Sequence, residues 1–182
     1  MQNVFLIYGV GGDRQENWFP WLKRELESLG CNVIYPMFPT PENQTLGSWL
    51  AVLDKYLDDL TPDSIVVGHS LGVAFLLNVL EKHRIKAAFF VAAVSGPLEN
   101  KFDEIMKTFS HRKFNWDLIR KNCGHFRVFH SDNDQYIPFK KAEDLAMRLC
   151  ADLMLVKGAG HINEQAGYTK FPLLLDEIRK EL

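Results

Sequence analysis

The sequence predicts an α/β fold in which a mostly parallel sheet carries helices on both of its faces. Short apolar runs rich in β-branched residues alternate along the chain with longer helix-like segments, which is typical of parallel sheets. Residues 87–94 are apolar without interruption, as expected of a strand at the centre of such a sheet. With 182 residues and 47% hydrophobic content, the chain can bury a sizeable core.

The predicted elements alternate in order along the chain. The predicted strands are 4–8, 32–35, 64–67, 85–94, 127–130 and 153–156. The predicted helices are 18–29, which Gly30 terminates, and 46–60, 71–83, 140–149 and 171–181. Residues 96–124 are polar and irregular, with one or two short helices near 102–109 and 116–121. No repeat or low-complexity linker divides the sequence, so we expect a single domain over residues 1–182.

Composition narrows the possible partners and the compartment. The net charge is −2 and the charges are scattered, so no nucleic-acid partner is expected. The longest apolar run is too short to span a bilayer and no signal peptide is recognisable, so no membrane partner is expected either. The three cysteines are widely spaced and no two of them form a Cys-x-x-Cys pair, which argues against a disulfide framework or a zinc site. These features together predict a cytoplasmic protein.

The pattern Gly-x-Ser-x-Gly occupies residues 68–72, between a predicted strand and a predicted helix. A sharp strand-to-helix turn presents the Ser70 hydroxyl at the helix N-terminus, and the flanking glycines allow neighbouring backbone to approach closely. The pattern is short, but the strand–turn–helix setting makes it specific. A serine hydroxyl is a poor nucleophile without a base, so a nucleophilic Ser70 requires a second residue.

His161 is the preferred base among six histidines. It follows the last predicted strand, and its loop therefore emerges at the same carboxyl edge of the sheet as Ser70, where open α/β sheets bind ligands. His130, at the end of another strand, is the main rival, whereas His69 is expected to have a structural role. The chain order serine, acid, histidine also favours His161.

The base needs a carboxylate that orients its ring, and Asp134 is the preferred candidate. It lies in the loop after the penultimate strand, just before a helix that begins near Pro138. Asp132 competes for the role, but its position is also typical of a turn or cap residue.

Hydrolysis through an acyl-enzyme also needs hydrogen-bond donors for the oxyanion. The backbone N–H groups of Leu71 and Val10 are predicted to supply them, the latter from the glycine-rich loop 9–12. That loop is not a dinucleotide fingerprint, because Arg14 occupies the place of the third glycine, and no Walker A sequence is present.

With these residues in place, the chain resembles the α/β-hydrolases, and more narrowly the small serine hydrolases related to retinoblastoma-binding protein 9 and bacterial YdeN. The segments that carry the resemblance are 8–12, 17–22, 68–72, 134–138 and 160–161, and it extends over nearly the whole chain. It implies a sheet of about six strands, no metal or organic cofactor, and roles for Ser70, Asp134 and His161 as nucleophile, orienting acid and base. Tyr8 departs from the pattern, because many relatives have histidine before Gly9.

The substrate is less well defined than the chemistry. Trp18, Phe38 and Trp116 are candidates to line a pocket, although aromatic residues at helical spacing more often belong to the core. Residues 96–124 stand where larger hydrolases insert a lid, and at this length they form only a short flap. We therefore expect a serine hydrolase of small esters or amides, with no protein partner assigned; the alternative is a non-catalytic binding or regulatory protein on a hydrolase scaffold.

Overall fold

The computed structural model describes residues 1–182 and contains one six-stranded sheet in which every neighbouring pair is parallel. The strand order is β2-β1-β3-β4-β5-β6. The strands are β1 (Asn3–Ile7), β2 (Asn32–Ile34), β3 (Ile65–His69), β4 (Ile85–Val91), β5 (Cys123–His130) and β6 (Asp152–Leu155). The predicted fold is confirmed.

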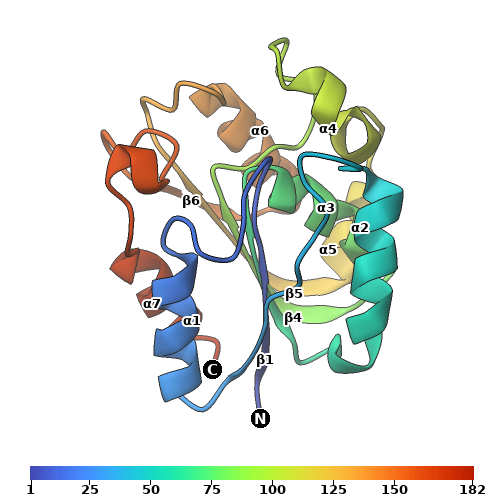
Figure 1. Cartoon of the computed structure of the whole chain (residues 1–182), viewed down its shortest axis with the longest axis vertical. Helices are drawn as coiled ribbons and strands as arrows, with labels where there is room; N and C mark the ends of the chain where they lie inside the picture. Colours follow the sequence, from blue (N-terminus) through green and yellow to red (C-terminus); the bar gives the residue numbers. More distant parts are fainter.

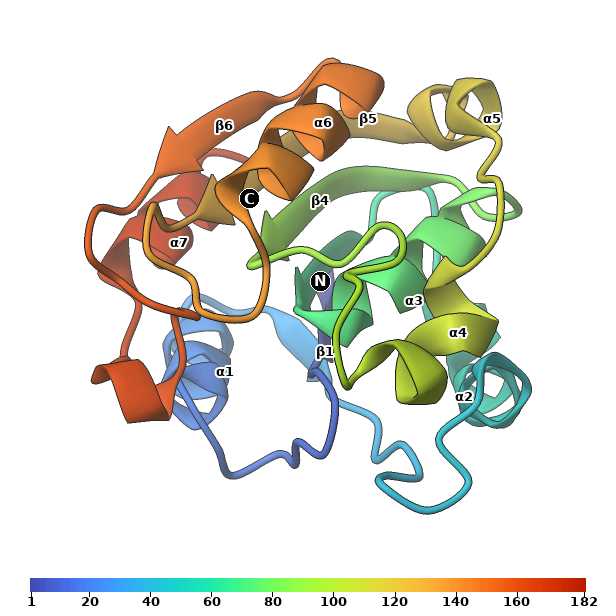
Figure 2. The same ribbon diagram turned by 90° about the horizontal axis from the view of Figure 1, so that it is seen from above.

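Helices cover both faces of this sheet (Figure 1). The helices are α1 (Phe19–Ser28), α2 (Leu46–Leu53), α3 (Leu71–Leu80), α4 (Asp103–Ser110), α5 (Trp116–Lys121), α6 (Phe139–Leu149) and α7 (Pro172–Arg179). Helices α1 and α7 lie side by side on one face, whereas α2, α3 and α5 lie on the other, as Figures 1 and 2 both show. Helix α6 packs against β5 and β6 next to α5.

Helix α3 occupies the centre of the molecule. All of its residues are buried, in agreement with the nearly continuous apolar sequence that predicted it. Such a helix is stabilised by packing on every side rather than by an amphipathic stripe. It begins directly after β3, so the core holds the strand-to-helix turn at a fixed place.

Several predicted boundaries are wrong: β4 ends at Val91 instead of residue 94, and α3 ends at Leu80 instead of residue 83. Two others differ by more. The segment 46–60 is not one helix, because α2 ends at Leu53 and continues as a 3-10 helix, Asp54–Asp59, none of whose residues is fully buried. Strand β5 begins at Cys123 instead of residue 127, because Cys123 pairs with Ile85 of β4. Residues 123–126, Cys-Gly-His-Phe, do not form a strand-like run by themselves, and pairing with the distant β4 leaves no local periodicity.

Candidate active site

The loops that follow β1, β3, β5 and β6 meet at the carboxyl end of the sheet, onto which Figure 2 looks. Ser70 lies between β3 and α3 with φ 55° and ψ −118°, a conformation that side-chain-bearing residues rarely adopt. The core on both sides of the turn holds this strained backbone. The turn predicted from the Gly-x-Ser-x-Gly pattern is therefore present, with the serine at its corner.

The glycines around Ser70 make room for close backbone contacts. A Cβ on Gly72 would lie 2.7 Å from the carbonyl oxygen of Tyr8, and closer still to that of Ile7, so α3 touches β1 at this point. A Cβ on Gly9 would lie 2.9 Å from the Ser70 Cβ. Any larger residue at either position would push the loop after β1 away from the serine.

His161 and Asp134 form a buried hydrogen-bonded pair. The His161 Nδ1 donates to the Asp134 Oδ2 at 2.8 Å, and the Asp134 side chain is fully buried. The other carboxylate oxygen accepts hydrogen bonds from the backbone N–H groups of Tyr136 and Ile137. Burial raises the pKa of Asp134, but His161 and the two N–H groups outweigh it and hold that pKa below its usual value. The acid therefore stays ionised beside the imidazole.

The two rival candidates have structural positions. His130 is completely buried, and its Nε2 donates to the carbonyl oxygen of Ile137 at 3.0 Å, while the same nitrogen lies 4.0 Å from Asp134. Burial lowers the pKa of His130, so its ring stays neutral. Asp132 accepts a hydrogen bond from the N–H of Gly158 at 2.8 Å and so links two loops. Neither residue lines the cavity described below.

The predicted oxyanion donors flank the serine. Val10 lines the same cavity as Ser70, and its N–H makes no hydrogen bond within the chain. Leu71 is the first residue of α3, so its N–H has no acceptor one turn earlier. Tyr8 points away from this site: its hydroxyl donates to the carbonyl oxygen of Phe38 at 2.9 Å and anchors the loop after β2.

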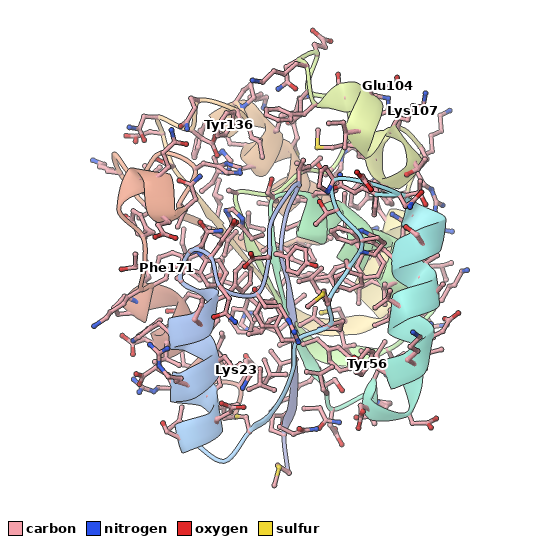
Figure 3. All side chains as sticks on the ribbon, in the orientation of Figure 1. Lys23, Tyr56, Glu104, Lys107, Tyr136 and Phe171 are labelled. Carbon is pink, nitrogen blue, oxygen red and sulfur yellow. The ribbon has the colours of Figure 1, made fainter.

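One cavity of about 210 Å³ contains the serine and the histidine. Its apolar wall comes mainly from the segment between β4 and α4 and from the loop after β5, and its polar wall from the loop after β1 and from Asn163. Figure 3 shows Tyr136 of the apolar wall at the same end of the molecule as Glu104 and Lys107 of α4. The apolar lining residues are Val10, Val94, Leu98, Phe102, Met106, Tyr136 and Ile137.

The three aromatic pocket candidates lie elsewhere. Trp18 is fully buried, and its ring packs against that of Phe19 with centroids 4.1 Å apart and a tilt of 31° between the rings. Phe38 stacks on Trp49 with centroids 4.5 Å apart. Trp116 lines a separate surface hollow beside Arg148. Trp18 and Phe38 therefore belong to the core, and Trp116 lies at another part of the surface. The aromatic character of these residues did not indicate which part of the fold they contact.

Three residues of the apolar wall, Leu98, Phe102 and Met106, belong to the segment 96–124 that was predicted to form a short flap. Val94, Tyr136 and Ile137 lie outside that segment and were not predicted to line a pocket. Chain direction changes at Ala92, where φ is 47°, so residues after β4 turn over the site while remaining buried. The apolar run 87–94 therefore predicted a strand up to residue 94, whereas its last residue, Val94, lines the cavity. No local signal marks that change.

No group of three or more His, Cys, Asp and Glu side chains is arranged as a possible metal site. None of the helices has the length and apolar character needed to cross a bilayer.

A parallel sheet with a serine at the turn between β3 and α3, and with a histidine–aspartate pair at the same edge, defines an α/β-hydrolase. A family model described as Serine hydrolase matches residues 4–180, and the chain belongs to this family.

Individual relatives resemble the chain over almost its whole length. YdeN of Bacillus subtilis is 31% identical, with 97% of this chain and 94% of the relative covered. The serine hydrolase RBBP9 of Rattus norvegicus is 28% identical over 94% of this chain and 90% of its own. The crystal structure of YdeN superposes with a TM-score of 0.93 and 28% identity, and covers 100% of this chain and 98% of that one. The family and the fold therefore agree.

Proposed function

We propose that this protein cleaves small ester or amide substrates through an acyl-enzyme on Ser70. The observation that carries the proposal is that Ser70 and His161 line one cavity while the His161 Nδ1 is hydrogen-bonded to Asp134 at 2.8 Å. The Nδ1 is occupied as a donor, so the Nε2 of the neutral ring is the nitrogen available as a base.

In the first half-reaction the Ser70 Oγ attacks the substrate carbonyl carbon and its proton passes to the His161 Nε2. The backbone N–H groups of Val10 and Leu71 stabilise the oxyanion that develops. The tetrahedral intermediate then collapses, the bond to the leaving alcohol or amine breaks, and His161 returns the proton to that leaving group. Asp134 stays ionised throughout and stabilises the imidazolium.

In the second half-reaction water attacks the acyl-enzyme, with His161 as the base that takes its proton. Collapse of the second intermediate releases the acid and returns the proton to the Ser70 oxygen. The polar wall of the cavity, which includes Glu16, Asn17 and Asn163, offers hydrogen-bond partners to that water.

The size and lining of the cavity favour a substrate with a small apolar acyl group. Its volume of about 210 Å³ suits a short acyl chain, and Leu98 and Phe102 offer apolar contact to that chain. We also propose a cytoplasmic location, which is supported by three free cysteines, of which Cys31 and Cys123 are buried.

Covalent labelling by a fluorophosphonate probe tests the proposed function. The wild type is expected to be labelled, and Ser70→Ala is expected to lose the label completely. Ser28→Ala, at an exposed position of α1, is the matched control and is expected to label like the wild type. A folded wild type that stays unlabelled would contradict the proposal and favour a non-catalytic protein on the same scaffold.

A further inference from the structure

Trp18 and His69 are two buried side chains that the proposed chemistry leaves without a role. Trp18 is fully buried and His69 nearly so. Both direct a ring N–H at the loop of His161. The Trp18 Nε1 donates to the carbonyl oxygen of Ile162 at 2.9 Å. The His69 Nε2 lies 2.9 Å from the carbonyl oxygen of His161 and is therefore the protonated nitrogen of its ring.

These two bonds meet a strained stretch of backbone. Ile162 has φ 49°, a left-handed conformation that is unfavourable for a β-branched residue. Gly160, two residues earlier, is also left-handed, with φ 54°. Strained conformations persist only where the surroundings over-determine them. The two buried donors, Trp18 and His69, supply such surroundings because they bind the consecutive carbonyl groups of Ile162 and His161.

The opposite side of the same loop is held from the loop after β5. Three side chains there accept hydrogen bonds from backbone N–H groups of the His161 loop. Ser131 accepts from Ala159 at 2.9 Å, Asp132 from Gly158 at 2.8 Å and Asn133 from Gly160 at 2.7 Å. These bonds fix the loop relative to Asp134 but not relative to the serine. The carbonyl side of the loop is thus the side that faces β3.

His69 makes the link to the nucleophile direct. It is the last residue of β3 and is bonded covalently to Ser70, so a hydrogen bond from its ring to residue 161 sets the distance between the two functional loops. Its ring also lies next to that of His161, with centroids 4.8 Å apart, and stands edge-on to Trp18 at 5.9 Å. The three rings are thus in contact in the order Trp18, His69, His161, and the two histidines also line the cavity.

We propose that Trp18 and His69 are positioning residues, which hold the His161 backbone so that its imidazole faces Ser70. This inference rests on the proposed function, because it explains how the base is aimed. It predicts that loss of either ring N–H disturbs the base. Trp18 does not line the cavity, so its replacement leaves every lining group in place, whereas the His69 ring forms part of the cavity lining.

The first test removes one N–H and keeps the aromatic ring. In Trp18→Phe, kcat for p-nitrophenyl butyrate is expected to fall by about 10- to 100-fold with little change in KM, because small displacements of a catalytic group cost this much. Trp49→Phe is the matched control: Trp49 is also fully buried, and its indole donates to the carbonyl oxygen of Pro39 at 3.0 Å. That variant is expected to keep kcat within about twofold of the wild type, because it does not touch the loop of the base.

The second test uses His69. His69→Leu is expected to lose activity like Trp18→Phe, whereas His69→Gln restores a donor near the former Nε2 and is expected to recover most of it. Rescue by Gln but not by Leu separates the hydrogen bond from simple packing.

A spectroscopic readout separates this inference from the proposed function. The downfield NMR resonance of the proton between His161 and Asp134 is expected to shift or broaden in Trp18→Phe and His69→Leu and to be unchanged in Trp49→Phe. Equal spectra and equal kcat in the two tryptophan variants would overturn the inference. A wild type without hydrolysis would instead contradict the proposed function, and the resonance would still decide whether the two donors hold the imidazole.

Discussion

Burial of His69 gives the protein a stability that depends on pH. Burial, and secondly the nearby charge of His161, lower the pKa of His69 from 6.5 to about 3. Below pH 6.5 the unfolded chain takes up a proton at this residue, but the folded chain does not until the pH approaches 3. The stability contributed by the neutral ring is therefore complete above pH 6.5 and is lost as the pH falls.

The size of the effect follows from the width of this window. Each pH unit between the two pKa values costs about 1.4 kcal/mol, so acidification from pH 7.5 to pH 5 removes about 2 kcal/mol through this one residue. His69→Gln does not titrate and is expected to lack this part of the pH dependence.

Urea unfolding followed by tryptophan fluorescence at both pH values measures the effect. The free energy of unfolding of the wild type is expected to fall by about 2 kcal/mol more than that of His69→Gln. His83→Gln, just beyond the far end of α3 from Ser70, controls for the loss of a histidine as such. The same fall in wild type and His69→Gln would refute the reasoning, because it would mean that the folded protein protonates His69 without penalty.

Three further outcomes are expected. Gly72→Ala should lower the free energy of unfolding by about 1–3 kcal/mol or more in urea titrations, because its Cβ would lie 2.7 Å from the Tyr8 carbonyl oxygen; wild-type stability would show that α3 can move away from β1. Asp134→Asn should reduce kcat for p-nitrophenyl butyrate by about four orders of magnitude while the fold, checked by circular dichroism, persists, and a tenfold loss or less would contradict the role of the acid. Phe102→Ala should raise KM for butyrate more than for acetate esters, because it removes part of the apolar wall, whereas Trp116→Ala should not; equal effects would mean that the substrate lies elsewhere.

The sequence predicted the features that depend on neighbouring residues. The turn at 68–72 needs glycines at fixed offsets from Ser70, and the apolar runs on either side of it specify a strand and a helix. Strand order along the chain also predicted that Asp134 and His161 follow the last two strands, and parallel pairing then brings their loops to one edge. These predictions succeeded because backbone sterics and hydrophobic periodicity are local properties.

Contacts between distant segments were decided only by the tertiary structure. Trp18 appeared as a pocket candidate, and its bond to Ile162 joins residues 144 positions apart. His69 is 92 positions from His161, and nothing near either residue in the sequence predicts their hydrogen bond. Local patterns tell which side chains are apolar or polar and which way the chain turns. Which buried ring meets which carbonyl group depends on how six strands and seven helices pack together, and that packing fixes how the base of this site is held.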